Sequence, residues 1–332
     1  GVYLGTSAVF QILVGPLSDR IGRRTVSLWA LIIFIVVSIS CVYAPNTFIF
    51  MCLRALQAIA ACTFVVARAI VRDTTETQAS GSKIAYISMG TAICPMFGPA
   101  LGGLMDGWFG WEANFWFIGG LGLFILVIAY FDLGETVPEN TQGFRQQFSE
   151  YPELLLSRRF WGYCLASAFG AGAFFAYLGG GPFVGSIVYN LSPEMLGLYF
   201  GAPAIGYFFG NFLSGRFTIR FGIDAMILWG LWIIFSGLSL SMVCSYVGYG
   251  TVETFFGFMI FVGLGNGLTI PNATAGMLSV RPHLAGTASG LGGAMMIAIG
   301  AALSTLAGAF LVPGSNEMPL LMLMWFSSLS GV

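Results

Sequence analysis

The sequence predicts an all-α protein that crosses a membrane many times. Of its 332 residues, 57% are hydrophobic and 8% are charged, whereas a soluble domain carries about 25% charged residues. The mean hydropathy is +0.86, and apolar runs long enough to cross a bilayer recur along the whole chain. Such a chain cannot cover itself with a polar surface, so we expect a polytopic membrane protein.

Eleven segments approach the roughly 20 mostly apolar residues that a membrane-crossing helix needs. The longest contains three consecutive glycines and Pro182, so we expect a break or bend at 179–182. The first and last segments are short, and we expect the complete protein to have a further span before Gly1 and a longer last span, twelve in all. The expected spans are 1–17, 26–44, 48–70, 84–105, 114–133, 160–189, 196–215, 223–245, 254–277, 286–311 and 318–332.

Basic residues occupy every second gap between these spans, and by the positive-inside rule those gaps are cytoplasmic. The other gaps hold acidic residues but no Lys or Arg. We therefore expect a multi-pass protein of the cell inner (cytoplasmic) membrane. The basic gap residues are Arg20, Arg23, Arg24, Arg72, Lys83, Arg145, Arg158, Arg159, Arg220 and Arg281; Arg68 and Arg216 lie at span ends on the same side, and Arg54 lies inside a span.

The longest cytoplasmic gap, 134–159, is polar and divides the expected helices six and six. We expect an N-terminal bundle at 1–133 (helices 2–6), a cytoplasmic linker at 134–159 and a C-terminal bundle at 160–332 (helices 7–12). A short internal sequence repeat supports this division, because "LSDRI" at 17–21 resembles "LSGRF" at 213–217. Parallel repeats of six spans are typical of two-half secondary transporters.

The charged stretch "GPLSDRIGRR" separates the first two spans. An anchor on the cytoplasmic side would need only its three arginines, not Asp19, which can cap a helix or pair with an arginine. We therefore favour a cytoplasmic latch between helices, with a simple anchor as the alternative. Gly215 replaces Asp19 in the second copy, which predicts a weaker or differently built latch there. The gating-loop candidates are Gly15, Asp19, Arg20, Gly22, Arg23 and Arg24.

Arg54 is a charged residue inside a span, which is costly and by default functional. It lies roughly 6–10 Å below the outer end of its helix at 1.5 Å per residue, so snorkelling to the interface is one interpretation. The alternative is an interior position, because 54, 58, 61, 65, 68 and 72 form a small, polar helix face. Gln57, one turn on, and Gln11 are its polar candidate partners.

Two further groups of residues are candidates for conformational change and substrate binding. "PMFGPALGG" can form a hinge and a seal between the halves, or simply a bent helix. Aromatic and Met side chains suit hydrophobic substrates of varied shape. The hinge candidates are Pro95, Gly98, Pro99, Gly102 and Gly103, and the pocket candidates are Gln11, Phe174, Tyr177, Phe200, Asn266, Met295 and Met296.

These motifs resemble a known family. "GPLSDRIGRR" resembles the signature loop between helices two and three of major facilitator superfamily transporters, "LRALQAIAA" is similar to their fourth-helix motif, and "PMFGPALGG" to the fifth-helix motif of their drug antiporters. "VVARAIVRD", "GWEANFWF", "GET" and "FFAYLGGGPFV" resemble more narrowly the bicyclomycin-resistance (Bcr/CflA-type) branch. The resemblance covers essentially the whole chain. It implies a major facilitator fold of two six-helix bundles, a gating role for the first motif, and proton coupling by Arg54 and Gln57 through an acid in the family's first helix.

We therefore expect a proton-coupled secondary transporter that exports small amphipathic drugs or toxic compounds by alternating access. One alternative is a transporter of a specific metabolite such as a sugar or nucleoside, which should have more buried polar side chains. A second is a non-transporting receptor or an enzyme, but the sequence contains no GxSxG or HExxH motif.

The composition also sets expectations about cofactors and partners. The single histidine, His283, and the absence of a CxxC pair argue against a metal site. The absence of GxxxxGK[ST] leaves the proton gradient as the energy source. The expected partners are an amphipathic substrate and the lipid bilayer, with no nucleotide and, at a net charge of -1, no nucleic acid. We expect a monomer.

Overall fold

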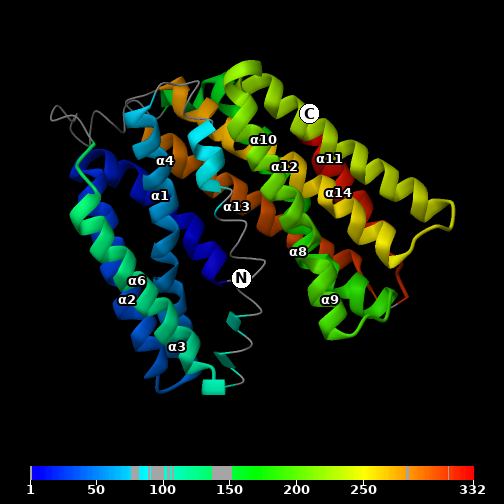
Figure 1. The fold of residues 1–332 in the computed structure, drawn as a ribbon, viewed down its shortest axis with the longest axis horizontal. Coiled ribbons are helices and arrows are strands. Elements are labelled where there is room, and N and C mark those ends of the chain that lie inside the picture. Colours follow the sequence, from blue (N-terminus) through cyan, green and yellow to red (C-terminus); the bar gives the residue numbers. More distant parts are fainter. Residues whose placement is uncertain are drawn as a thin grey trace. The chain divides into compact units, whose positions relative to one another are not determined.

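The computed structural model describes residues 2–75, 82–88, 90, 101–102, 105–106, 108–136, 152–281, 284–312 and 314–332. This part of the chain consists of helices and their connections, without a strand (Figure 1). Seven of the helices in these ranges are long and apolar enough to cross a membrane. The prediction of an all-α, multi-pass membrane protein is confirmed.

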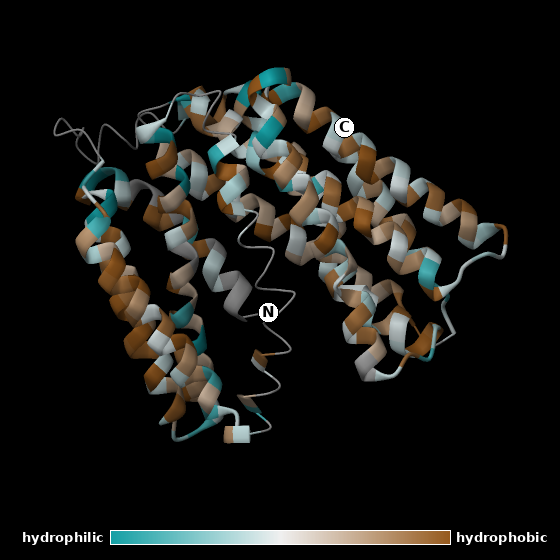
Figure 2. Cartoon of the chain, in the orientation of Figure 1, coloured by the Kyte–Doolittle hydropathy of each residue, from teal (hydrophilic) through white to brown (hydrophobic). Residues whose placement is uncertain are grey.

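The first of two compact units contains residues 1–75, 97–160 and 277–297. In it, α2 and α6 are hydrophobic along most of their length, whereas hydrophilic residues gather where α1 meets α2 (Figure 2). A short 3-10 turn interrupts the span expected at 48–70. The elements are α1 (Val2–Ile21), α2 (Arg23–Val42), α3 (Thr47–Gln57), the 3-10 turn η1 (Ala58–Ala60), α4 (Ala61–Thr74) and α6 (Glu112–Asp132).

The second unit contains residues 76–96, 161–276 and 298–332. One of its helices, α13, begins in the first unit, and the expected span at 196–215 is divided at Gly201. Most of the expected linker lies outside the described residues, so the division at 134–159 stays a prediction. The elements are α8 (Arg158–Phe183), the π-helical η2 (Val184–Val188), α9 (Pro193–Phe200), α10 (Ala202–Phe221), α11 (Ile223–Tyr246), α12 (Val252–Val280), α13 (Ala285–Phe310) and α14 (Met318–Gly331).

The break expected at 179–182 does not occur there. Helix α8 continues through the three glycines and Pro182 to Phe183, and only then becomes π-helical in η2. The glycines instead allow neighbouring helices to approach closely. A β-carbon on Gly179 would overlap the backbone of Ser304 in α13, and one on Gly180 would meet Leu320 in α14. Close packing, and not a chain break, explains the glycine run.

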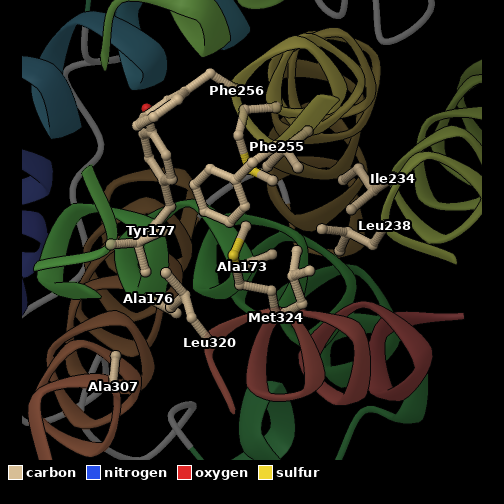
Figure 3. Close-up of a cluster of buried hydrophobic side chains, with 14 of the residues drawn as sticks. Ala173, Ala176, Tyr177, Ile234, Leu238, Phe255, Phe256, Ala307, Leu320 and Met324 are labelled. Carbon is tan, nitrogen blue, oxygen red and sulfur yellow. The ribbon is translucent and has the colours of Figure 1, made fainter. Parts of the chain in front are cut away.

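The interior of the second unit is a cluster of buried apolar side chains (Figure 3). Tyr177 from α8, Phe255 and Phe256 from α12 and Met324 from α14 are all fully buried and point toward one another. Phe255 and Phe256 meet edge to face, with their ring centroids 5.0 Å apart. Such aromatic pairs add to the free energy gained from burial alone.

A glycine seam joins α10 to α12. A β-carbon on Gly206 would overlap the carbonyl oxygen of Ile260, and one on Gly263 would overlap the carbonyl oxygen of Pro203. The two backbones are therefore in direct contact. In a bilayer, where lipid tails are as apolar as leucine, such close van der Waals packing replaces the hydrophobic effect as the force that joins helices.

Replacing Gly206 by alanine should lower the melting temperature of the purified protein, because the new β-carbon forces α10 and α12 apart. Overpacking of this kind costs on the order of 1–3 kcal/mol. Gly257→Ala in α12 is the matched control, since nothing lies within 4 Å of its added β-carbon and alanine favours a helix by about 1 kcal/mol over glycine. Thermal unfolding in detergent, followed by tryptophan fluorescence, measures both variants. Equal melting temperatures would contradict the seam.

Candidate functional site

The junction between α1 and α2 is a single residue. Helix α1 continues to Ile21, and α2 begins at Arg23, so Gly22 alone connects them, with a φ of 106°. The expected spans 1–17 and 26–44 left a longer connecting loop here, and that prediction is wrong. Gly15 and Asp19 lie within α1. The left-handed φ at Gly22, which glycine adopts without steric cost, makes this abrupt change of direction possible.

Arg23 lies almost completely buried at this junction, with 3% of its surface exposed. Its guanidinium is 2.5 Å from the Asp19 carboxylate and its Nε is 3.1 Å from Oδ2 of Asp73 in α4. Nη1 also donates to Oγ of Ser18 at 2.6 Å. A buried arginine needs such charged and hydrogen-bonding partners to offset its lost hydration, so α1, α2 and α4 are tied together at one point.

Asp19 also binds the beginning of α13, which belongs to the same compact unit. Its Oδ2 accepts hydrogen bonds from the backbone N of Thr287 at 3.1 Å and from Oγ1 of Thr287 at 3.2 Å. The first backbone N–H groups of a helix lack partners within that helix, and a carboxylate is favoured by the helix dipole there. Asp19 thus forms both an ion pair and a helix cap, and the cap lies on a helix from the second half of the sequence.

Glu135, immediately after α6, caps the beginning of α2. Its Oε1 accepts from the backbone N of Arg23 at 2.8 Å, and its Oε2 lies 3.3 Å from the backbone N of Arg24. Sequence reasoning did not select Glu135, although "GET" follows a span end as an acidic cap would. It did not select Asp73 or Thr287 either. Arg24 covers the Tyr130 ring at 5.6 Å from the centroid, and Arg20 is exposed in the last turn of α1.

Within the first unit, a chain of hydrogen bonds connects Arg54 on α3 to α2. Nη1 of Arg54 donates to Oε1 of Gln57, and Nε2 of Gln57 donates to Oγ of Ser38 at 2.8 Å. The hydroxyl of Ser38 in turn donates to the carbonyl of Phe34 at 2.6 Å. Gln57 is 1% exposed. Each group is therefore satisfied inside the protein, and the chain joins α3 to α2.

The helix face that contains Arg54 is turned toward the protein interior. Ala58 and Val65 on this face are fully buried, and Arg54 is half-buried. The Arg54 guanidinium lies 5.7 Å from the centre of the Phe115 ring in α6, a distance at which a cation is attracted to an aromatic face. These contacts favour the interior interpretation of Arg54 over snorkelling.

The family model of the Major Facilitator Superfamily matches residues 1–305. This chain belongs to the Major Facilitator Superfamily. A chloramphenicol resistance protein of Pseudomonas aeruginosa is 32% identical over 90% of this chain and 72% of its own length. A bicyclomycin resistance protein homolog of Haemophilus influenzae is 27% identical over 89% of this chain and 75% of its own. The resemblance to drug-resistance members of the superfamily is thereby confirmed.

The major facilitator fold is confirmed by solved structures as well. The proton:xylose symporter XylE superposes with a TM-score of 0.77 and 14% sequence identity, covering 99% of this chain and 82% of the symporter. At this level of identity the likeness concerns the fold alone.

Three pocket candidates of this major facilitator protein are packed together. The Tyr177 ring stacks on Phe200 with centroids 4.7 Å apart, and its hydroxyl donates to the carbonyl of Phe200 at 3.2 Å. The Phe174 ring also stacks with that of Tyr177, with centroids 6.4 Å apart. Tyr177 is fully buried in the apolar cluster (Figure 3), and Phe174 and Phe200 are partly buried against it. The role of these residues in substrate binding stays a prediction.

The remaining pocket candidates are distributed over both units. Asn266 in α12 is buried, and its Oδ1 has no hydrogen-bond partner within the described ranges. Gln11, Met295 and Met296 belong to the first unit, where the buried Gln11 side chain lies against Gly293. A single site formed by all of these candidates stays a prediction.

The second sequence copy is built differently from the first. Where the first copy has the Asp19 carboxylate, the Tyr86 ring lies against Gly215, and Oγ of Ser82 donates to the Gly215 carbonyl. Of the hinge candidates, Gly102 accepts a hydrogen bond from Nδ2 of Asn114 at 3.3 Å. Pro95, Gly98, Pro99 and Gly103 lie outside the described residues.

A second buried carboxylate, Glu317, lies just before α14, in a gap predicted to face the outside. It accepts a hydrogen bond from Oγ of Ser245 at the end of α11. Burial, and then the nearby Glu317 charge, raise the pKa of Tyr189, since both disfavour the tyrosinate. This cluster joins three helix ends of the second unit.

A comparison of two junction glycines tests the Glu135 cap. Gly22→Ala should lower the melting temperature more than Gly222→Ala. Both glycines have a positive φ with a ψ of 146° or 160°, a region essentially restricted to glycine, so each substitution costs on the order of 1–3 kcal/mol of backbone strain. At Gly22 the β-carbon would also overlap the Glu135 carboxylate, whereas nothing lies within 4 Å at Gly222. Thermal unfolding in detergent measures the difference. A larger loss for Gly222→Ala would contradict the packing of Glu135 on the junction.

Proposed function

We propose that this protein exports small amphipathic compounds across the cell inner membrane in exchange for protons. The observation that carries this proposal is the contact of Asp19, in the first half of the sequence, with the start of α13, in the second half. A transporter that alternates access moves one half against the other and must make and break contacts of this kind. The relatives named for chloramphenicol and bicyclomycin resistance support the export of such compounds.

The strength of the Asp19 contact suits a switch. A neutral hydrogen bond contributes roughly 0.5–1.5 kcal/mol and one to a charged group about 1.5–3 kcal/mol, which is comparable to the few kcal/mol that separate two conformations of a switching protein. When Asp19 leaves Thr287, Arg23 still balances its charge. The latch can therefore open without leaving a buried carboxylate unpaired, which would cost several kcal/mol.

Arg54 is the group through which protonation would act on the transport cycle. Its positive charge is held below the outer end of α3 by Gln57 and the Phe115 ring. An acid near this charge binds a proton with changed affinity, because a nearby cation lowers the pKa of a carboxyl group. Family resemblance implies such an acid in the superfamily's first helix. No cofactor or bound nucleotide takes part in this scheme, and the proton gradient is the energy source.

Export is tested in cells that express the protein and are loaded with a fluorescent amphipathic cation. Chloramphenicol and bicyclomycin serve as competing compounds, and a protonophore removes the gradient. We expect the cells to retain less dye, and the protonophore to abolish the difference. Export that persists with the protonophore would exclude proton coupling. Uptake of one sugar or nucleoside without any dye export would favour the single-metabolite transporter.

Arg54→Gln should abolish export while the amount of protein in the membrane stays unchanged. The substitution removes the charge but retains a hydrogen-bond donor for Gln57. Arg54→Lys, which keeps the charge, should retain part of the activity. Arg158→Gln at the start of α8 is the matched control, because that side chain is exposed. Dye export per membrane-inserted protein measures all three, and full activity of Arg54→Gln would refute the coupling role.

Asp19→Asn should reduce the maximal export rate about tenfold or more, with a smaller change in the substrate concentration at half-maximal rate. The amide cannot pair with Arg23 as the carboxylate does. A loss of about 1.4 kcal/mol or more in the stabilisation of the rate-limiting conformational step corresponds to a tenfold or larger reduction in rate. Asp224→Asn is the control, since Asp224 is an exposed carboxylate that accepts a hydrogen bond from Tyr163. An unchanged maximal rate in Asp19→Asn would favour the anchor interpretation of this motif.

A further inference from the structure

An apolar groove runs along the second unit between α10 and α11, with α12 beneath it. Its volume is about 560 Å³, within the range of roughly 300–1,000 Å³ that is typical of ligand pockets. Nine of its ten lining side chains are apolar, and the tenth is the small hydroxyl of Ser236. The lining residues are Leu213, Phe217, Phe221, Met226, Trp229, Trp232, Ile233, Ser236, Phe261 and Leu268.

The groove has a solid floor and an open rim. Met226 and Leu268 form the floor and are almost fully buried, whereas the rings of Trp229 and Trp232 are about half exposed. Close approach of α11 to α12 fixes this shape, because a β-carbon on Gly230 would overlap Thr269 and the backbone of Gly265. The groove is thus a formed surface that accepts a chain-like apolar ligand.

Positive charge lies at one end of this apolar surface. Arg220, in the last turn of α10, is exposed and lies over the Phe221 ring at 5.3 Å from the centroid. It makes no ion pair or hydrogen bond to any residue in the described part of the chain. Arg216, also exposed, lies one turn earlier on the same side of α10. The arginine pattern of the sequence places this end in the cytoplasmic leaflet.

The carboxylate of Asp224, close in sequence to Arg220, is turned away from this end. Asp224 is on α11, but helical spacing places it on the side opposite the groove-lining Met226 and Trp229. Its Oδ1 accepts a hydrogen bond from the hydroxyl of Tyr163 in α8 at 2.8 Å. The guanidinium groups of Arg216 and Arg220 therefore remain available to an external anion.

We propose that this groove is a binding site for an anionic phospholipid of the cytoplasmic leaflet. One acyl chain lies along Phe217, Trp229 and the floor of the groove, and the phosphate accepts hydrogen bonds from Arg220, with Arg216 adding charge. Basic pockets between transmembrane helices on the cytoplasmic side are suited to anionic headgroups. A guanidinium also matches the geometry of a phosphate with two parallel N–H groups.

A groove in the first unit provides an internal comparison. It lies between α2 and α6, has a volume of about 410 Å³ and includes Trp29 and Tyr130 in its lining. Here the nearby Arg24 already donates Nη2 to the carbonyl of Tyr130 at 2.9 Å and covers the Tyr130 ring. The first groove thus offers an apolar surface whose arginine is engaged within the protein, and selectivity for anionic lipid belongs to the second groove.

Native mass spectrometry of the purified protein tests the site, with added phosphatidylglycerol and, separately, phosphatidylcholine of the same acyl chains. The wild-type protein should bind its first phosphatidylglycerol more tightly than phosphatidylcholine. Arg220→Gln should weaken phosphatidylglycerol binding on the order of tenfold, the factor expected for losing a hydrogen bond between charged groups, and leave phosphatidylcholine unchanged. Arg220→Lys should restore part of the loss. Arg158→Gln is the control, because Arg158 is exposed and does not line the groove.

Trp229→Ala should weaken both lipids, because it removes apolar surface and no charge. Melting temperatures in detergent show whether each variant is folded. Equal wild-type affinity for the two lipids, or unchanged phosphatidylglycerol binding by Arg220→Gln, would overturn the proposal. A different outcome is that chloramphenicol displaces phosphatidylglycerol with the same inhibition constant in the wild type and in Arg220→Gln. That result would identify the groove as an entry for transported compounds, and it would also overturn the lipid proposal.

Discussion

Burial of the Arg23 guanidinium organises the end of the first unit where α1 and α2 meet. In an environment without water, each polar group must find its partner within the protein, and Arg23 draws partners from several helices. Asp19 comes from α1 and Asp73 from α4. The same Asp19 holds α13, while Glu135 after α6 holds the backbone of Arg23. Five helix ends are thus positioned by one charge and the groups that neutralise it.

The two sequence copies meet the same need by different means. The first copy uses a carboxylate against a helix N-terminus, an interaction that weakens when water enters. The second uses Gly215, whose missing side chain admits the Tyr86 ring, together with one neutral hydrogen bond from Ser82. A contact of that kind responds to packing and hardly to charge. The two copies therefore differ in the kind of contact that holds them, a charged one in the first copy and a neutral, packed one in the second.

The sequence predicted the helical class, most spans and the special position of Asp19, Arg23 and Arg54, because hydropathy and charge within apolar runs are local signals. It did not predict that α1 and α2 are connected by Gly22 alone, or that Glu135, more than a hundred residues away, caps α2 at this junction. The break expected at the glycines of α8 was wrong for a similar reason, and the bend stays a prediction. They resemble a break in isolation, and only the neighbouring Ser304 and Leu320 show that they serve close packing. Partners this distant in sequence cannot be identified from the local pattern alone.

Arg54 lies one turn before an interruption in its helix. The regular α-helix ends at Gln57, and the 3-10 turn η1 begins with the next residue. Such a turn has poorer hydrogen-bond geometry than the α-helix on either side, and within a longer helix it often marks a hinge. The chain from Arg54 through Gln57 to Ser38 fixes the segment before this turn against α2. A change in charge near Arg54 would act on that chain, and α4, which carries Asp73 at its far end, begins directly after the turn. The charged residue within the membrane and the Arg23 network are therefore connected through one interrupted helix.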